Sequence, residues 1–240
     1  MTYCVGLLLD QGIVCLSDTR TNAGLDNIAT YRKTFTFESP GERAIVIMTA
    51  GSLSVTQTAL ARLDEAATHL DATPETSILL APSLLQVAQI IGRTLAEVSS
   101  DVAARMGASA AQASASMIVA GQRTGGDMRM FLVYPEGNFI EATADTPYLQ
   151  IGEHKYGKPI LDRVVTPETS LDDAKKAVLL SMDSTLRSNL SVGMPLDLTV
   201  LEKDAFALQS RRIEEGDPTF RAMSDQWSEA LRRSFTEVTI

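Results

Sequence analysis

Residues 2–24 of the 240-residue chain, TYCVGLLLDQGIVCLSDTRTNAG, carry the strongest signal for the fold class. Two apolar runs, TYCVGLLL and IVCLSD, flank Asp10-Gln11-Gly12, a sequence typical of a hairpin turn. A buried helix is excluded, because Gly12, Gly24 and Pro40 interrupt every window long enough to form one. The chain therefore opens with two paired strands, and the first of them starts at residue 2.

Outward from this hairpin, the sequence predicts strands, two helices, strands, helices, strands and a last helix. Apolar runs bounded by turn residues predict strands at 33–37, 44–51, 114–122, 128–134, 138–143, 195–202 and 205–213. Apolar residues at steps of three and four predict helices at 53–70, at 84–106, from the capping box Ser170-x-x-Asp173 onward, and after Asp217-Pro218.

Two antiparallel sheets with this many apolar helices bury every apolar face only if helices cover both outer sides. The fold class is therefore α+β, a four-layer αββα sandwich of two antiparallel sheets. The βα alternation of a doubly wound fold is absent. One domain spans residues 1–240, because no linker, repeat or low-complexity tract divides the chain, and residues 214–240 form a C-terminal helical extension.

Composition limits the partners and the compartment. A formal charge of -9 argues against nucleic acid or an anionic membrane as a partner. No apolar run is long enough for a membrane span, and the first residues lack the basic start of a secretory signal. Two cysteines, Cys4 and Cys15, lie in strand-like runs and indicate buried free thiols in the cytoplasm, and neither of the two histidines has metal-site spacing. We expect no metal and no cofactor.

The chemistry is expected at the start of the chain. The sequence has no GxSxG elbow, Walker loop, GxGxxG or HExxH motif. These absences argue against a serine esterase, an NTPase, a dehydrogenase and a zincin, respectively. Thr2 follows Met1, and its small side chain permits removal of Met1. The resulting threonine carries its own base, because an α-amine titrates near pH 7.7–8.0 and can activate the hydroxyl. Taken alone, Thr2 is also an ordinary second residue of a cytoplasmic protein.

The opening segment resembles proteasome β subunits, which are N-terminal-nucleophile hydrolases. The shared features are a strand that starts with Thr, a D-x-G-type turn, a strand that ends in Asp18-Thr19-Arg20, and then Gly24. The continuation TNAGLDNIATYRK, residues 21–33, is most similar to the bacterial Anbu group, the proposed ancestral β subunits. The resemblance is specific over the first fifty residues and extends loosely to about residue 213, so it implies a single proteasome-type domain.

The resemblance implies a role for each matching position. Thr2 would be the nucleophile, Lys33 would lower the proton affinity of its amine, and Asp18 would orient Lys33. Gly51 would stabilise the oxyanion through its N–H, and Ser191 would hydrogen-bond the amine of Thr2. The substrate-binding residues would be Thr21, Tyr31, Thr49 and Leu53, a neutral and partly polar lining that favours uncharged side chains.

Each position also has a structural alternative. Asp18 and Arg20 could pair at a strand end, Lys33 could be a solvated lysine, and Gly51 could be a turn residue. The chain departs from the family pattern at Ser188, where the family has an aspartate, and at Glu153 and His154, which replace a Ser-Gly pair.

The sequence therefore predicts a threonine peptidase that cleaves peptide or protein substrates within a ring or spiral homo-oligomer. Two alternatives remain open at this point: an amidohydrolase for a narrow peptide or small-molecule substrate, and a catalytically silent scaffold subunit of the same fold. The sequence does not decide whether an ATPase partner exists.

Overall fold

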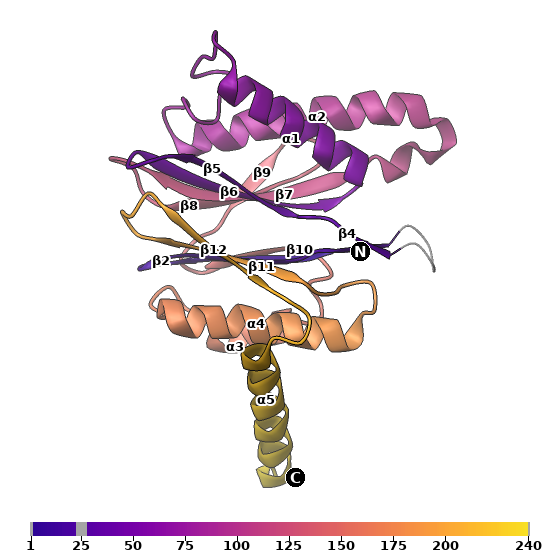
Figure 1. Cartoon of the computed structure of the whole chain (residues 1–240), viewed down its shortest axis with the longest axis vertical. Coiled ribbons are helices and arrows are strands. Elements are labelled where there is room, and N and C mark those ends of the chain that lie inside the picture. The colour runs from indigo at the N-terminus through magenta and orange to yellow at the C-terminus, as the bar shows by residue number, and fades with distance from the viewer. Residues whose placement is uncertain (1, 23–27, 240) are drawn as a thin grey trace.

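A computed structural model describes residues 2–22 and 28–239 and has the four layers expected from the sequence (Figure 1). Met1 and Gly24, which entered the sequence argument, lie outside the described residues. Two helices cover one sheet, a second sheet packs beneath it, and further helices cover the outer side of that second sheet. The predicted fold class, a four-layer αββα sandwich of two antiparallel sheets, is confirmed.

The first sheet contains the N-terminal hairpin, and all its neighbouring strands are antiparallel. Its order is β10 (Tyr148–Gly152), β1 (Tyr3–Leu9), β2 (Gly12–Asp18), β11 (Leu196–Glu202) and β12 (Leu208–Ile213). Strand β2 is buried along its whole length, which explains why its sequence is almost uniformly apolar rather than alternating.

The second sheet is also antiparallel throughout. Its order is β5 (Thr34–Ser39), β6 (Arg43–Gly51), β7 (Ala115–Arg123), β8 (Arg129–Val133) and β9 (Phe139–Glu141). A short pair, β3 (Arg20–Asn22) and β4 (Ile28–Thr30), stands apart from both sheets.

Three apolar clusters fill the spaces between the four layers. Helices α1 (Leu53–Thr68) and α2 (Leu84–Met106), followed by the 3₁₀ turn η1 (Gly107–Gln112), pack on the second sheet. Helices α3 (Lys158–Val164) and α4 (Leu171–Ser188) pack on the first sheet. The third cluster lies between the two sheets and contains both Cys4 and Cys15, so the prediction that these thiols are free and buried is confirmed.

The last helix, α5 (Pro218–Glu237), begins against α4 and then extends away from the body of the molecule (Figure 1). Only Ser224 is buried among its residues, and Leu231 and Phe235 are 50% and 82% exposed. None of the helices in the described residues is long and apolar enough to cross a membrane.

The structure differs from the sequence-based elements in several places, and the short elements β3, β4 and α3 were not predicted. The strand expected at 205–213 begins only at Leu208, because Asp204 and Phe206 have φ values of 62° and 49°, which an extended strand does not allow. The edge strand β10 was not predicted at all. It contains only five residues, and Gln150 interrupts its apolar side chains, so it forms no continuous apolar run of the kind that marks β1 and β6.

Candidate active site

Thr2 lies directly before the start of strand β1 and beside the end of strand β10. The backbone N–H of Glu153 donates to the Thr2 carbonyl oxygen at 2.7 Å, and β1 starts at the next residue, Tyr3. Gly152 has a φ of +80°, and a Cβ on it would overlap the Thr2 carbonyl oxygen. Residue 152 must therefore be glycine for Thr2 to occupy this place.

Asp18 and Lys33 form a buried ion pair behind Thr2. Asp18 ends β2 and is fully buried, and Lys33 directly precedes β5 and is 5% exposed. The Lys33 Nζ lies 2.7 Å from Asp18 Oδ1 and also donates to the Arg20 carbonyl oxygen at 2.7 Å. The pairing of Asp18 with Lys33 that the sequence predicted is therefore present in the structure.

Backbone donors complete the surroundings of the Asp18 carboxylate. The Tyr3 N–H donates to Oδ1 at 3.0 Å, and the Gly193 N–H donates to Oδ2 at 3.2 Å. Burial raises the pKa of Asp18 above its ordinary value, while the Lys33 ammonium and the two N–H groups act in the opposite direction. The Tyr3 contact ties the carboxylate to the residue next to Thr2.

A cavity of about 530 Å³ opens beside Thr2, and we call it the nucleophile cavity. Six residues that the sequence assigned to the site line this cavity. They are the expected catalytic residues Thr2, Lys33 and Gly51 and the expected substrate-binding residues Thr21, Thr49 and Leu53. Gly51 has a φ of +110°, and a Cβ on it would overlap the Ser114 carbonyl oxygen, so glycine is required here as well.

Two of the expected site residues lie elsewhere. Tyr31 lines a separate cavity between β5 and α1 and is 40% exposed, so it does not line the nucleophile cavity. Ser191 lies in the loop after α4, where its N–H donates to Asn189 Oδ1 at 2.9 Å. Within the described part of the chain, no hydrogen bond joins Ser191 to Thr2, and its contact with the amine remains a prediction.

The nucleophile cavity also contains charged residues that the sequence argument did not assign to it. Arg32 and Glu153 both line it, so the expectation of a lining without fixed charge was wrong. Arg32 was missed because the residue beside a functional lysine has no signal of its own. Glu153 stands out in the sequence only as a departure from the family, although it lies in the lining of the nucleophile cavity beside Thr2.

Comparison with known proteins identifies the family. The family model described as proteasome subunit matches residues 2–201. The chain belongs to the proteasome family. The resemblance to the Anbu group is also confirmed by solved structures. Anbu (ancestral beta-subunit) from Yersinia bercovieri is 42% identical, with a TM-score of 0.91, and the match covers 99% of this chain and 98% of that one.

Two further Anbu structures are similar over nearly their whole length. The Anbu (Gly-1) mutant from Hyphomicrobium sp. strain MC1 is 45% identical, with a TM-score of 0.93 and coverage of 100% of this chain and 99% of that one. The helical assembly of the Anbu complex from Pseudomonas aeruginosa is 43% identical, with a TM-score of 0.90 and coverage of 99% and 97%. No curated protein sequence matches the chain.

Proposed function

We propose that this proteasome-family chain is a threonine-type N-terminal-nucleophile hydrolase that cleaves peptide bonds in the cytoplasm once Met1 has been removed. One observation carries the proposal: a buried Lys33–Asp18 ion pair lies beside the cavity that Thr2 lines. A buried charge pair is costly to maintain, and a pair used only for stability has no need of a cavity with a hydroxyl next to it.

The proposed reaction is acyl transfer. The Thr2 Oγ1 attacks the carbonyl carbon of the scissile bond while its proton passes to the α-amine of the same residue. The oxyanion accepts a hydrogen bond from the Gly51 N–H. The C–N bond then breaks, the leaving amine takes the proton, and water hydrolyses the remaining ester. Lys33 keeps the amine deprotonated by placing a positive charge near it, and Asp18 orients Lys33.

The test combines intact mass with covalent labelling. Protein isolated from cells should lack Met1, and an epoxyketone or β-lactone peptide should add one adduct at Thr2. The Thr2→Ala variant, which retains the same backbone, is the matched control and should remain unmodified. Processed wild-type protein that stays unmodified in large excess of reagent would refute the enzyme and favour the scaffold.

A narrow-specificity amidohydrolase is the second candidate, and the charges in the nucleophile cavity favour it. Arg32 and Glu153 are a cation and an anion in one cavity, so they select a substrate with complementary charges rather than any unfolded chain. A peptide-library profile separates the two candidates. Cleavage of many unrelated uncharged sequences supports the broad peptidase, and cleavage confined to charged sequences supports the narrow enzyme.

We further propose that the chain works within a homo-oligomer. The Pseudomonas aeruginosa Anbu complex, which is 43% identical to this chain, forms a helical assembly. The projecting part of α5, with its exposed Leu231 and Phe235, is the apolar surface that we expect to contact a neighbouring subunit.

A further inference from the structure

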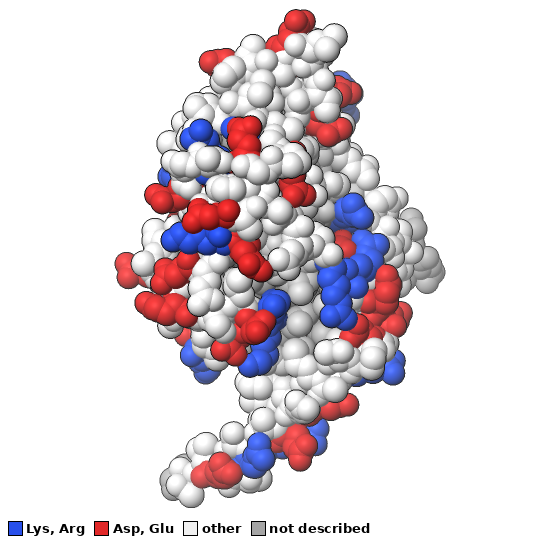
Figure 2. All heavy atoms as spheres, turned by 60° about the vertical axis from the view of Figure 1, so that its left-hand side comes forward, with Lys and Arg blue, Asp and Glu red and all other residues white. Residues whose placement is uncertain are grey.

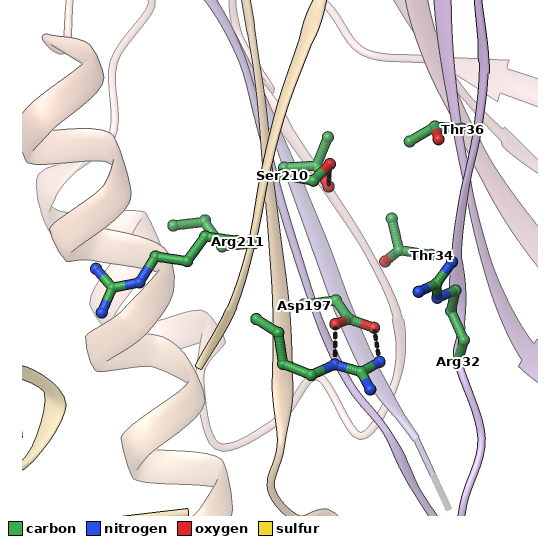
Figure 3. A pocket seen from close by; sticks show the side chains of 9 residues that line it. Arg32, Thr34, Thr36, Asp197, Ser210 and Arg211 are labelled. Carbon is green, nitrogen blue, oxygen red and sulfur yellow. Dashed lines mark hydrogen bonds and ion pairs between the residues drawn. The ribbon is translucent and has the colours of Figure 1, made fainter. Parts of the chain in front are cut away.

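A second cavity of about 330 Å³ opens between the edges of the two sheets, and we call it the edge cleft. One wall carries Thr34 and Thr36, which lie two positions apart on β5 and so point to the same side, and Arg32, which lies two positions before β5 begins. The opposite wall comes from β11 and β12, and Asp197 and Ser210 on it face the β5 side (Figure 3).

The strand register explains why the second wall is polar. Asp197 lies directly opposite Arg212 in the β11–β12 ladder, and Thr199 lies directly opposite Ser210. Arg212 donates to both oxygens of Asp197, from Nε at 2.8 Å and from Nη2 at 2.9 Å. The Asp197 charge is therefore neutralised within its own wall, and the Nη1 of Arg212 still has hydrogens to donate.

Arg32 differs from the other arginines of the edge cleft. Within the part of the chain that the structure describes, no carboxylate pairs with Arg32, whereas Arg212 pairs with Asp197. The neighbouring Arg211 points away from the cleft (Figure 3) and pairs with Asp217 at 2.8 Å. Among the arginines of the cleft, Arg211 and Arg212 are each paired with a carboxylate, and Arg32 adds a positive charge beside several hydroxyl groups.

We propose that the edge cleft binds a small tetrahedral oxyanion of the phosphate class, held between Arg32 on one wall and Arg212 with Ser210 on the other. A tetrahedral oxyanion directs acceptors to both walls at once, whereas a planar carboxylate is satisfied by one arginine fork. The chain as a whole repels anions, since its formal charge is -9. On the face shown in Figure 2, basic side chains lie in small groups with acidic ones beside them. Saturable anion binding therefore requires a local site.

The edge cleft lies close enough to the nucleophile cavity for a ligand bound in the cleft to affect the cavity. Arg32 lines both cavities, and Thr34, which directly follows Lys33, hydrogen-bonds Ser17, which directly precedes Asp18. An anion that pairs with the Arg32 guanidinium in the edge cleft neutralises a positive charge that would otherwise face the substrate in the nucleophile cavity. Binding itself does not depend on whether Thr2 is a nucleophile.

The test is calorimetric titration of the full-length protein with inorganic phosphate at constant ionic strength. We expect saturable binding that Arg32→Gln weakens roughly tenfold or more, as loss of a charge-assisted hydrogen bond implies. Arg212→Lys should also weaken it, because lysine preserves the charge beside Asp197 but not the fork.

The matched control is Arg211→Gln, which removes an adjacent arginine that points the other way and should leave phosphate affinity unchanged. Acetate should bind more weakly than phosphate. Absence of saturable heat, equal loss in the Arg32 and Arg211 variants, or acetate binding as tightly as phosphate would each overturn the proposal.

Discussion

At the scale of single residues, Asp18 is buried and keeps two backbone donors besides Lys33. We predict that Lys33→Met lowers the free energy of unfolding by about 3–5 kcal/mol, because it leaves a buried carboxylate without its cation. The double variant Lys33→Met/Asp18→Asn removes both charges and should recover most of that loss. Urea unfolding of the three proteins measures the difference.

The same two variants separate stability from catalysis. If Lys33 activates Thr2, the double variant should fold and still fail to form the epoxyketone adduct. A stable double variant that is labelled at the wild-type rate would contradict the proposed role of Lys33. Asp18→Asn alone, with unchanged labelling, would contradict only the orienting role of Asp18.

A glycine also decides where Thr2 lies. We predict that Gly152→Ala slows labelling of Thr2 roughly a hundredfold, the scale of effect expected when a reacting group shifts by about 1 Å. The reason is that the new methyl group would overlap the Thr2 carbonyl oxygen. The measurement is the rate of adduct formation followed by intact mass.

Gly125→Ala is the matched control for this change. Gly125 has a φ of +71°, similar to the +80° of Gly152, but a Cβ there would have nothing within 4 Å. Both alanines should cost about 1–2 kcal/mol of stability for the left-handed backbone, and Gly152→Ala should cost more and displace Thr2, because its Cβ overlaps the Thr2 carbonyl oxygen. Equal labelling rates for the two variants would show that Gly152 does not position the nucleophile.

At the scale of elements, strands β1 and β2 place two thiols in the apolar layer between the sheets. Burial raises the pKa of Cys15 to about 12 from its ordinary value of 9.0, and it raises the pKa of Cys4 as well. The folded state therefore keeps protons that the unfolded chain releases. This contribution to stability is fully present below pH 9 and is lost as the pH rises toward 12.

We predict that the free energy of unfolding is level up to pH 9 and falls between pH 9 and pH 10.5, by about 1.4 kcal/mol per pH unit for each thiol. Cys15→Ala should reduce this slope by the contribution of one thiol, about 1.4 kcal/mol per pH unit. Val46→Ala, in the same layer but without a titrating group, should be destabilised equally at both pH values. Urea unfolding under reducing conditions measures both. A Cys15→Ala slope equal to that of wild type would contradict the prediction.

At the scale of the whole molecule, α5 is attached by a polar network at its first turns and is exposed beyond it. The Asp183 carboxylate accepts hydrogen bonds from Ser224 at 2.7 Å and from Arg187 at 3.0 Å, which joins α5 to α4. The exposed apolar side chains begin after this attachment, at Leu231 and Phe235. The attachment and the proposed contact surface can therefore be tested separately.

We predict that the full-length protein is a homo-oligomer of roughly six or more copies, because oligomers of identical subunits are usually symmetric assemblies of several copies. Leu231→Ser/Phe235→Ser should loosen it while leaving the Ser224 contact in place, since each buried apolar side chain contributes roughly 1.5–3 kcal/mol. Light scattering over a dilution series measures the mass. The control is Arg233→Ser, on the opposite side of the helix.

A monomer mass for the wild-type protein at micromolar concentration would refute the assembly. If deletion of residues 217–240 left the oligomer mass intact, only the role of α5 would be wrong.

The elements with strong local patterns were predictable from the sequence. The hairpin of β1 and β2, strand β6 and helix α2 all carry long apolar runs or stripes, because each buries a continuous face. The order Thr2, Asp18, Lys33, Gly51 was also readable, since all four lie at the ends of such elements. Strand β10 was not, because it contains only five residues and no long apolar run.

The surroundings of Tyr31, Arg32 and Lys33 depend on how the two sheets pack and could not be read from these residues alone. Tyr31 lines the cavity beside α1 but not the nucleophile cavity, Lys33 lines the nucleophile cavity and pairs with Asp18, and Arg32 borders both of these cavities and the edge cleft. Residues 31–33 lie just before β5, where no regular strand pattern fixes the side that each residue faces. The sequence determined which residues are present, and the packing of two sheets determined which of them meets the nucleophile.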